Sequence, residues 1–449
     1  MPLTAPIGLH VIGSGVGESI VVELPDGSIG VVDCCSKSLA GNSAEDRARA
    51  NPTIAFLQRR FPNAQVAFLA LTHLHEDHGK GFTQLIEELE TRIQSIWICG
   101  GLNDTHVLQY FKQVAKHQKQ LPGEEIFDEP PGTYARELLK LTRQVRQAAP
   151  ATAFGVRRLC STTQFHICNG EVAVDILGPR ELRLLHFSES VQALLRDSID
   201  PATRVVRSDW EPKSPKHNEV SPAIAITYGR TRLVLGGDME CNAWAEVVAD
   251  TSTHVPPRSL ACHVLKVSHH GSSNGYCQTL YQKLGGSRKF VAIVTPYFRG
   301  EHPLPEREGI QALLPFTSEI FVTDIERTRE KLVDTQSAVS HRVSKSLSAA
   351  PEIRPYLSPT ISLVQERTLA PTSMPHSIAK ALRQDSAIKD VLDRSLIRKE
   401  PKPNFHRASD DHRVSLYFDR QGNELRRKRE VGSKAGVLSP ETLESSSNA

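Results

Sequence analysis

Short apolar runs alternate with segments of helical spacing over the first 325 residues, and this pattern predicts a layered α/β protein. The run Val-Ala-Phe-Leu-Ala-Leu at 66–71 predicts a buried strand. Phe82, Leu85, Ile86 and Leu89 follow it with the spacing of an amphipathic helix. A strand, a short polar turn and a helix therefore follow one another in this part of the chain.

The same alternation predicts the remaining elements. Apolar runs predict strands at 9–12, 20–24, 29–33, 95–99, 172–177, 223–228, 231–238, 263–267, 290–295 and 319–324. Helical spacing predicts helices at 181–197, 243–248 and 306–314. The loop at 13–19 has three glycines, but it lacks the spacing of a phosphate-binding loop, so we interpret it as a structural turn.

Two regions depart from this pattern. Residues 102–160 have helical periodicity interrupted by Pro and Gly, which predicts a helical insertion that can act as a substrate lid. Residues 326–449 are polar and rich in Ser, Thr and Pro, which predicts a partly disordered extension with a helix near 376–398 and a hairpin near 414–423. We therefore expect a domain at 1–325 and an extension at 326–449.

The extension is also basic. Residues 380–434 carry 15 Lys/Arg and 9 Asp/Glu, a net charge of +6, and include the run Arg426-Arg427-Lys428-Arg429. Such a run is usually a solvated tail, and the alternatives are contact with a phosphate backbone or docking of a protein partner.

The polar turn Thr72-His73-Leu74-His75-Glu76-Asp77-His78-Gly79 contains three histidines and a free carboxylate. In extended chain His73 and His75 point the same way and can bind one cation. Asp77 and His78 begin the helix and can reach a second cation. Imidazole and carboxylate together suit Zn²⁺, Mn²⁺ or Fe. Three unrelated surface histidines are the alternative, but the spacing favours a metal site.

Other candidate residues stand at the ends of predicted strands. Asp33 ends one strand, where it can cap the strand or orient a metal-bound histidine. Asp238 ends another, and a helix follows it as one follows residues 66–71. His269 and His270 come directly after a third strand. A pair of histidines in this position favours a site over packed core residues, because the chain already holds the other candidate ligands.

Composition narrows the class of protein. Hydrophobic residues make up 39% of the 449 residues and charged residues 23%, as in ordinary soluble proteins, and the net charge is +3. No apolar run approaches the ~20 residues that span a bilayer, and residues 1–5 lack the basic and apolar regions expected of a signal peptide. None of the eight cysteines forms a Cys-x-x-Cys pair. We therefore expect a cytoplasmic protein with reduced thiols and no membrane partner.

The set formed by Asp33, the motif from His73 to His78, Asp238 and His269-His270 resembles the metallo-β-lactamase fold superfamily. The pattern is most similar to the nuclease-like domain of the bacterial competence DNA-uptake protein family. Its shared features are Asp33-Cys34, Asn218 to Ser221, Gly237-Asp238, Leu265 to Ser272 and His302-Pro303. The resemblance covers residues 8–325 and leaves out the membrane channel of that family.

This resemblance implies a four-layer αββα sandwich with two divalent ions, Zn²⁺ or Mn²⁺. It implies that His73 and His75 hold one ion, that Asp77 and His78 hold the other, and that Asp238 bridges them. The last ligand of the second ion is His270, or alternatively His269. For the third histidine of the first ion, the family pattern has Asn218, and the adjacent His217 is the alternative.

The resemblance further implies a hydrolase that cleaves phosphodiesters with a metal-activated hydroxide, most simply a DNA nuclease. Asp77 would hold the proton of the nucleophile, and His302 would stabilise the phosphorane or the leaving oxygen. A small-molecule hydrolase acting on a cyclic nucleotide, lactone or thioester is one alternative. A metal-binding component of a multiprotein assembly is the other.

Overall fold

The computed structural model describes residues 3–37, 50–117, 133–148, 155–161, 163–203, 205–207, 209–213, 215–253, 259–299, 302–329, 331–332, 412–425 and 429–438. Residues 1–324 and 406–436 form one compact unit, and residues 325–405 with 437–449 form another. The elements of the first unit carry every candidate site residue. The predicted helix near 376–398 and most of the basic stretch lie outside the described residues.

The first sheet has eight strands, and its two halves differ in direction. In spatial order they are β15 (Glu430–Val431), β14 (Arg413–Phe418), β1 (Ile7–Ile12), β2 (Ser19–Glu23), β3 (Ile29–Val32), β4 (Val66–Leu71), β5 (Ile96–Cys99) and β6 (Val156–Leu159). Pairing is antiparallel from β15 to β3 and parallel from β3 to β6.

The second sheet of this unit repeats the same plan. Its strands lie in the order β7 (Gln164–Ile167), β8 (Val172–Ile176), β9 (Ile224–Tyr228), β10 (Thr231–Leu235), β11 (Val264–Lys266), β12 (Phe290–Val294) and β13 (Thr317–Val322). Pairing is antiparallel from β7 to β10 and parallel from β10 to β13. β16 (Gly436–Leu438) stands at the boundary between the two units along the sequence.

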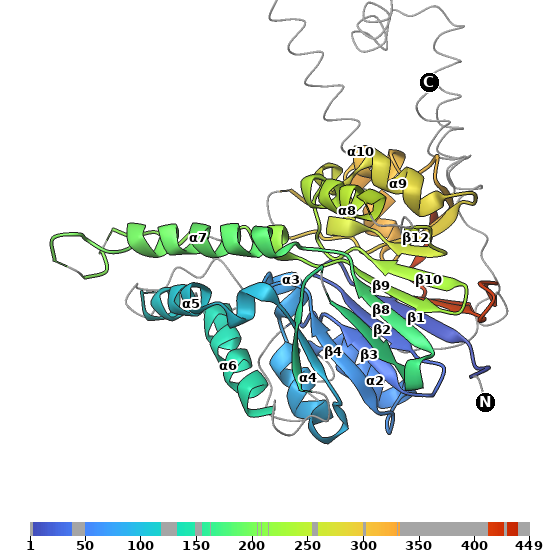
Figure 1. The fold of residues 1–449 in the computed structure, drawn as a ribbon, viewed down its shortest axis with the longest axis horizontal. Helices are drawn as coiled ribbons and strands as arrows, with labels where there is room; N and C mark the ends of the chain where they lie inside the picture. Colours follow the sequence, from blue (N-terminus) through green and yellow to red (C-terminus); the bar gives the residue numbers. More distant parts are fainter. Residues whose placement is uncertain are drawn as a thin grey trace, which may run out of the picture. The chain divides into compact units, whose positions relative to one another are not determined.

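Helices cover the outer faces of the two sheets, as Figure 1 shows. Near the first sheet lie α2 (Pro52–Arg60), α3 (Glu76–Gly79), α4 (Phe82–Leu89), α5 (Thr105–His117) and α6 (Thr133–Ala148). On the second lie α8 (Cys241–Thr253), α9 (Gln278–Gly285) and α10 (Arg307–Gln311). The helix α7 (Glu181–Asp197) follows β8 in the chain and lies beside α5. Apolar residues of α2, α4 and α6 share one core with strands β3 to β5.

An aromatic stack shows that the inner faces of the sheets meet. Phe68 of β4 stacks on Trp97 of β5 with ring centroids 4.0 Å apart, and Trp97 stacks on Phe165 of β7 at 4.5 Å. The stack therefore crosses from the first sheet to the second. Two sheets packed face to face with helices outside confirm the predicted αββα sandwich.

Two predicted regions contribute strands to the first sheet. The stretch 102–160 contains α5 and α6 but ends in β6, which pairs with β5. The hairpin predicted near 414–423 begins with β14, whose Val414 and Leu416 are fully buried and which pairs with all of β1. The boundary at 325/326 therefore assigns residues 406–436 to the extension, although they belong to the first unit. The sequence shows the apolar pattern of a strand, but it does not show which other strand pairs with it.

Candidate metal centre

The candidate residues gather where parallel strands of both sheets end. Asp33 follows β3, the 73–78 motif follows β4, Asp238 follows β10, and His269-His270 follow β11. Loops at the carboxyl ends of neighbouring parallel strands lie side by side, so the two sheets bring these loops to one place. The arrangement unites residues that are almost 200 positions apart, such as His78 and His270.

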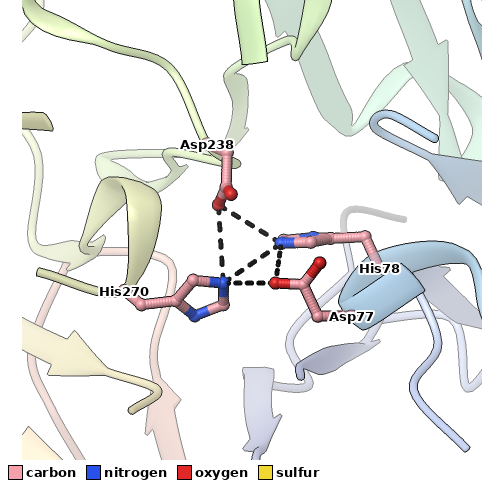
Figure 2. Close-up of side chains that lie close together, drawn as sticks. All are labelled: Asp77, His78, Asp238 and His270. Atoms are coloured by element: carbon pink, nitrogen blue, oxygen red, sulfur yellow. Dashed lines mark hydrogen bonds and ion pairs between the residues drawn. The ribbon is translucent and has the colours of Figure 1, made fainter. Parts of the chain in front are cut away.

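Four side chains converge in the group shown in Figure 2. His270 Nε2 lies 2.9 Å from Asp77 Oδ2 and 3.3 Å from His78 Nε2. His78 Nε2 lies 3.2 Å from Asp238 Oδ1. Asp77 and His78 come from the first-sheet side and Asp238 and His270 from the second, so the group closes only when both sheets are in place.

The hydrogen bonds behind the two histidines orient their Nε2 atoms. His78 Nδ1 lies 2.8 Å from Asp33 Oδ2, and His270 Nδ1 lies 2.9 Å from the carbonyl oxygen of Thr295. Because both partners are acceptors, each Nδ1 donates its proton to them, and each Nε2 would present a lone pair to a cation that displaces its proton. Imidazoles held in this way are typical of metal ligands.

The group fits a cation. Two imidazole lone pairs and two carboxylates face one another within 4.8 Å. Asp238 Oδ1 is buried and has no hydrogen-bond partner among the described residues. Its nearest cationic neighbour is His78 Nε2 at 3.2 Å. A buried carboxylate oxygen that accepts no hydrogen bond is costly, and a bound cation would remove that cost. The donors are those that Zn²⁺, Mn²⁺ and Fe accept.

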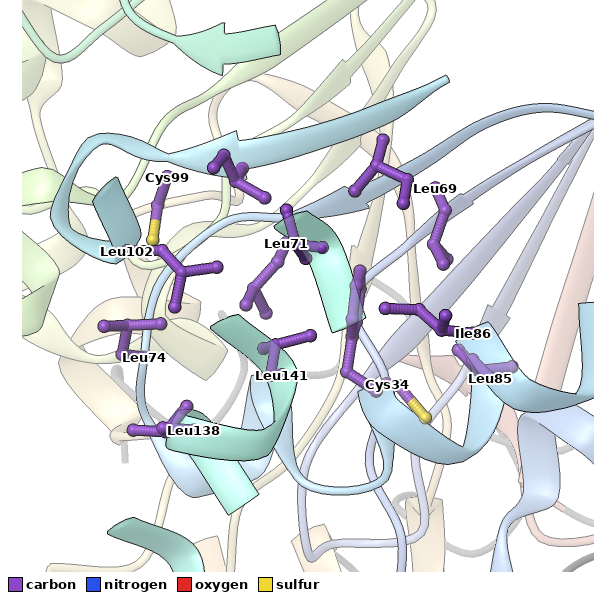
Figure 3. Packing of buried hydrophobic residues seen from close by; sticks show 14 of the residues in the cluster. Cys34, Leu69, Leu71, Leu74, Leu85, Ile86, Cys99, Leu102, Leu138 and Leu141 are labelled. Atoms are coloured by element: carbon purple, nitrogen blue, oxygen red, sulfur yellow. The ribbon is translucent and has the colours of Figure 1, made fainter. Parts of the chain in front are cut away.

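A second group forms beside the first. His73 Nε2 lies 3.2 Å from His75 Nδ1 and 3.6 Å from Asp238 Oδ2. Asp238 thus turns Oδ1 towards the first group and Oδ2 towards the second. Leu74, between the two histidines, is buried in the core beside Leu102 and Leu138 (Figure 3). Alternation along extended chain then turns His73 and His75 to the other side.

Asp33 organises the backbone of the histidine turn as well as His78. Its Oδ1 accepts from the backbone N–H of Thr72 at 2.7 Å, and its Oδ2 accepts from the Thr72 hydroxyl at 2.6 Å. The Thr72 hydroxyl also lies 3.0 Å from His73 Nδ1. Asp33 therefore contacts His78 of the first group directly and His73 of the second group through Thr72, as expected of a residue that orients a ligand histidine.

Electrostatics keep the carboxylates of Asp77 and Asp238 ionised and the imidazole of His73 neutral. Burial raises the pKa of Asp77, but His78 and His270 outweigh it and lower the pKa to about 2. Burial also raises the pKa of Asp238, yet the same imidazoles hold it well below its usual range. Burial lowers the pKa of His73 well below its ordinary value.

His78 behaves in the opposite way. Burial lowers its pKa, but the surrounding carboxylates, Asp238 and Asp77 foremost, raise it well above the ordinary value. The negative field that attracts a proton to His78 would equally attract a metal cation.

Three predicted residues lie beside these groups rather than in them. His217 is buried, with its ring centroid 5.2 Å from that of His75, and its Nδ1 has no hydrogen-bond partner in the described chain. Asn218 Nδ2 lies 3.2 Å from His269 Nε2. His269 Nδ1 lies 2.8 Å from Asn274 Oδ1, so its ring is held away from the four-residue group.

The ligand loops show unusual backbone conformations. Of the five non-glycine residues with positive φ in the described chain, three are Asp33 (59°), His269 (49°) and His270 (53°). Such conformations cost energy for side chains with a Cβ and cluster at functional sites. A bond from the His269 N–H to the Gly237 carbonyl, 2.9 Å, ties this loop to the one that carries Asp238.

A cavity of about 760 Å³ opens onto the two groups. Candidate ligands form its floor, and Leu74, Tyr110, Phe111 and Val114 give it an apolar wall. His302 is exposed and lines the cavity, as does Tyr297, whose ring stacks on His270 at 5.5 Å. Burial raises the pKa of Tyr297 to about 12, so its hydroxyl stays protonated at neutral pH.

Sequence reasoning missed several residues that surround the ligands. Glu18, Lys266, Thr295 and Tyr297 all contact ligand residues or one another. One signal was available, because Lys266 is a lone charge within the apolar run 263–267. The side chains of α5 that form the cavity wall carried no signal beyond ordinary helical periodicity.

Of three comparisons with known proteins, one finds similar chains, and these are solved structures. A scan against protein-family models finds no match, and a search of curated proteins finds none. Among solved structures, similar chains include the metallo-β-lactamase fold protein YhfI from Bacillus subtilis, with 13% identity, a TM-score of 0.32, and 71% of this chain and 95% of that chain covered. No membrane-crossing helix, long and apolar enough for a bilayer, occurs among the described residues.

Two further similar structures carry an activity in their descriptions. One is a long form of RNase Z from yeast, with 9% identity, a TM-score of 0.31, and 65% of this chain and 36% of that chain covered. The other is Igni18, a metallo hydrolase from Ignicoccus hospitalis, with 10% identity, a TM-score of 0.27, and 73% and 92% covered. At these identities and scores, the likeness carries no information on the activity or substrate of this chain.

Proposed function

We propose that this protein is a metal-dependent phosphodiester hydrolase that binds two divalent cations, Zn²⁺ or Mn²⁺. The observation that carries the proposal is the position of Asp238, which offers one carboxylate oxygen to each of two adjacent ligand groups. His73 and His75 would hold one ion, and Asp77, His78 and His270 the other. Such ions would lower the pKa of a water molecule and offset negative charge on a phosphate.

The side chains around the groups have complementary roles. Asp77 stays ionised and can orient the attacking water through its carboxylate. His302, on the exposed side of the cavity, can give a proton to the leaving oxygen. Tyr297 stays protonated and can donate a hydrogen bond to a phosphoryl oxygen. Asp33 would act on the reaction through the histidines that it orients, His78 directly and His73 by way of Thr72.

DNA is the substrate that we propose first. The support is the sequence pattern from Asn218 to Ser221, Gly237-Asp238 and Leu265 to Ser272, which resembles the nuclease-like domain of the competence family. Contact of the basic C-terminal stretch with the phosphate backbone would strengthen binding and make it depend on salt.

The test compares the wild type with Asp77→Ala on linear single-stranded, linear duplex and circular plasmid DNA, each with Mn²⁺, Zn²⁺ or chelator. Asp209→Ala is the matched control, because Asp209 is exposed and pairs with Arg207 outside the site. We expect metal-dependent cleavage that falls by about 10²–10⁴-fold in Asp77→Ala and persists in Asp209→Ala. Equal cleavage by the wild type and Asp77→Ala would contradict the proposal.

A small-molecule hydrolase is the second candidate, and the cavity favours it. A volume of about 760 Å³ is within the range of small-ligand sites, and one wall is apolar. The lining includes only one Lys or Arg, Lys213, among the described residues, against Glu76 and Glu306. Cyclic nucleotides, lactones and thioesters should be assayed beside DNA. Turnover of one of these in a salt-independent reaction, without cleavage of DNA, would favour this candidate.

Three expectations stay predictions: a metal-binding scaffold role, protein partners docked through the C-terminal extension, and a cytoplasmic location. Partner binding that survives in Asp77→Ala would support the scaffold.

A further inference from the structure

An ion pair lies buried directly behind the candidate metal ligands. Glu18 and Lys266 have no exposed surface, and Glu18 Oε2 contacts Lys266 Nζ. Glu18 is in the loop before β2 of the first sheet, and Lys266 is the last residue of β11 in the second sheet. The pair therefore links the two sheets at the level of the site.

Glu18 also reaches the ligands of one metal group. Its Oε2 lies 3.5 Å from His270 Nδ1, and its Oε1 lies 3.8 Å from His78 Nδ1. It accepts a hydrogen bond from the Thr295 hydroxyl, and the carbonyl of the same threonine accepts from His270. These contacts are with His78 and His270 of the first ligand group, or with Thr295, which bonds to His270. None of them is with His73 or His75.

The backbone holds Glu18 in this place. Its N–H donates to the Asp77 carbonyl at 3.0 Å. Gly17, just before it, has φ of 144°, and a Cβ there would lie 2.2 Å from the Asp77 carbonyl oxygen. Only glycine permits this approach. The loop is therefore fixed against the turn that carries Asp77 and His78.

Glu18 compensates the buried positive charge of Lys266. Lys266 Nζ has no hydrogen-bond partner among the described residues, so its ion pair with Glu18 is the compensation that the structure shows. Both charges act on His270: burial lowers its pKa, Asp238, Asp77 and Glu18 raise it, and Lys266 lowers it again. Without Glu18, Lys266 would be an uncompensated positive charge behind two metal ligands.

Buried ion pairs are poor sources of stability, since desolvation of both charges offsets their attraction. Stability therefore does not explain a buried ion pair at this position, and a role in the site is the alternative explanation. We propose that Glu18 and Lys266 are positioning residues that set the cation affinity of the Asp77–His78–His270 group. Glu18 offsets the charge of Lys266 and holds the turns of the two sheets together. This inference rests on the proposed function, because it assumes that the group binds a metal ion.

The test titrates the metal-free, full-length protein with Zn²⁺ by calorimetry and counts bound ions by elemental analysis. In Glu18→Gln, we expect affinity for one of the two ions to fall by roughly 10–100-fold, as for partners that orient metal ligands, while the other ion binds as in the wild type. In Glu18→Gln/Lys266→Met, both charges are gone, and we expect recovery to within about threefold of the wild type, the non-additivity of a coupled pair.

Asp175→Asn is the matched control, because Asp175 pairs with Arg232 within the second sheet and has no contact with the ligands. It should bind both ions like the wild type. A purely structural pair would change stability without selective loss of one ion, and metal affinity separates these outcomes. If Glu18→Gln does not fold, the double variant and Lys266→Met still give a result, because neither leaves Lys266 unpaired, and neither should lose an ion.

The results of this test distinguish failure of this inference from failure of the proposed function. A wild type that binds two ions, with Glu18→Gln unchanged, overturns only this inference. A double variant that binds the second ion as weakly as Glu18→Gln, or that loses it when Glu18→Gln cannot be obtained, also overturns it. A wild type that binds no ion overturns the proposed function, and this inference with it.

Discussion

The two halves of the candidate metal centre are built in different ways. The half on the first sheet comes from one turn, in which His73, His75, Asp77 and His78 stand within six residues. The half on the second sheet comes from separate loops that carry Asp238 and His270, and a backbone bond from His269 to Gly237 ties these loops together. Local chain geometry forms the first half, whereas the fold must assemble the second.

This difference has a physical consequence. The first half is oriented by contacts within the first-sheet side, with Leu74 in the core and Asp33, after the neighbouring strand β3, bonded to Thr72 and His78. The second half depends on the register between β10 and β11 and on two residues in left-handed conformation. The ligand groups include residues of both halves. A substitution should therefore affect one ion when its residue faces one ligand group, and both ions when its residue faces both groups.

The largest effect is expected at Asp238, because its two oxygens face both groups. In Asp238→Asn, we expect the affinity for both ions to fall by more than the roughly 10–100-fold that is typical when only an orienting partner is lost. Elemental analysis after dialysis measures this. His75→Ala is the comparison variant and should lose one ion alone. Two ions retained by Asp238→Asn would contradict the shared position.

The next effect separates two adjacent histidines. His270 Nε2 faces Asp77 and His78, whereas His269 bonds to Asn218 and Asn274. We expect His270→Ala to lose one ion and His269→Ala to retain both, as measured by calorimetric titration with Zn²⁺. The reverse order would show that the ligand loop adopts a different arrangement when metal is bound.

A smaller effect is expected at Asp33, which contacts His78 but is not in the two groups that share Asp238. Asp33→Asn replaces a charged acceptor of the His78 Nδ1 proton with a neutral one. Affinity for one ion should fall by roughly 10–100-fold, and activity should return at higher metal concentration. Activity that stays lost at saturating metal would instead assign Asp33 a direct part in the reaction.

The sequence predicted the first half more completely than the second for the same reason. Spacing alone indicated that His73 and His75 point to one side, and the structure brings them together with Asp238. Spacing did not decide between His269 and His270, because that choice depends on the left-handed turn at these residues. His217 and Asn218 were equally open, and the structure places one beside His75 and the other beside His269.

The fold shows the same limit. Apolar runs predicted most strands of both sheets and the layered class, but not β6 or β7. They did not predict that β14 pairs with β1 across some 400 residues, or that Glu18 meets Lys266 across the two sheets. Such partners are set by tertiary topology, for which a single sequence carries no periodic signal.

The most direct test of the central claim is a titration of the metal-free, full-length protein with Zn²⁺ or Mn²⁺. Hydrolysis of bis(p-nitrophenyl) phosphate is followed at each ratio of metal to protein. The proposal of a shared Asp238 predicts two ions bound per chain and hydrolysis that develops as the second ion binds. Absence of metal uptake, or hydrolysis that is unchanged by chelator, would contradict it.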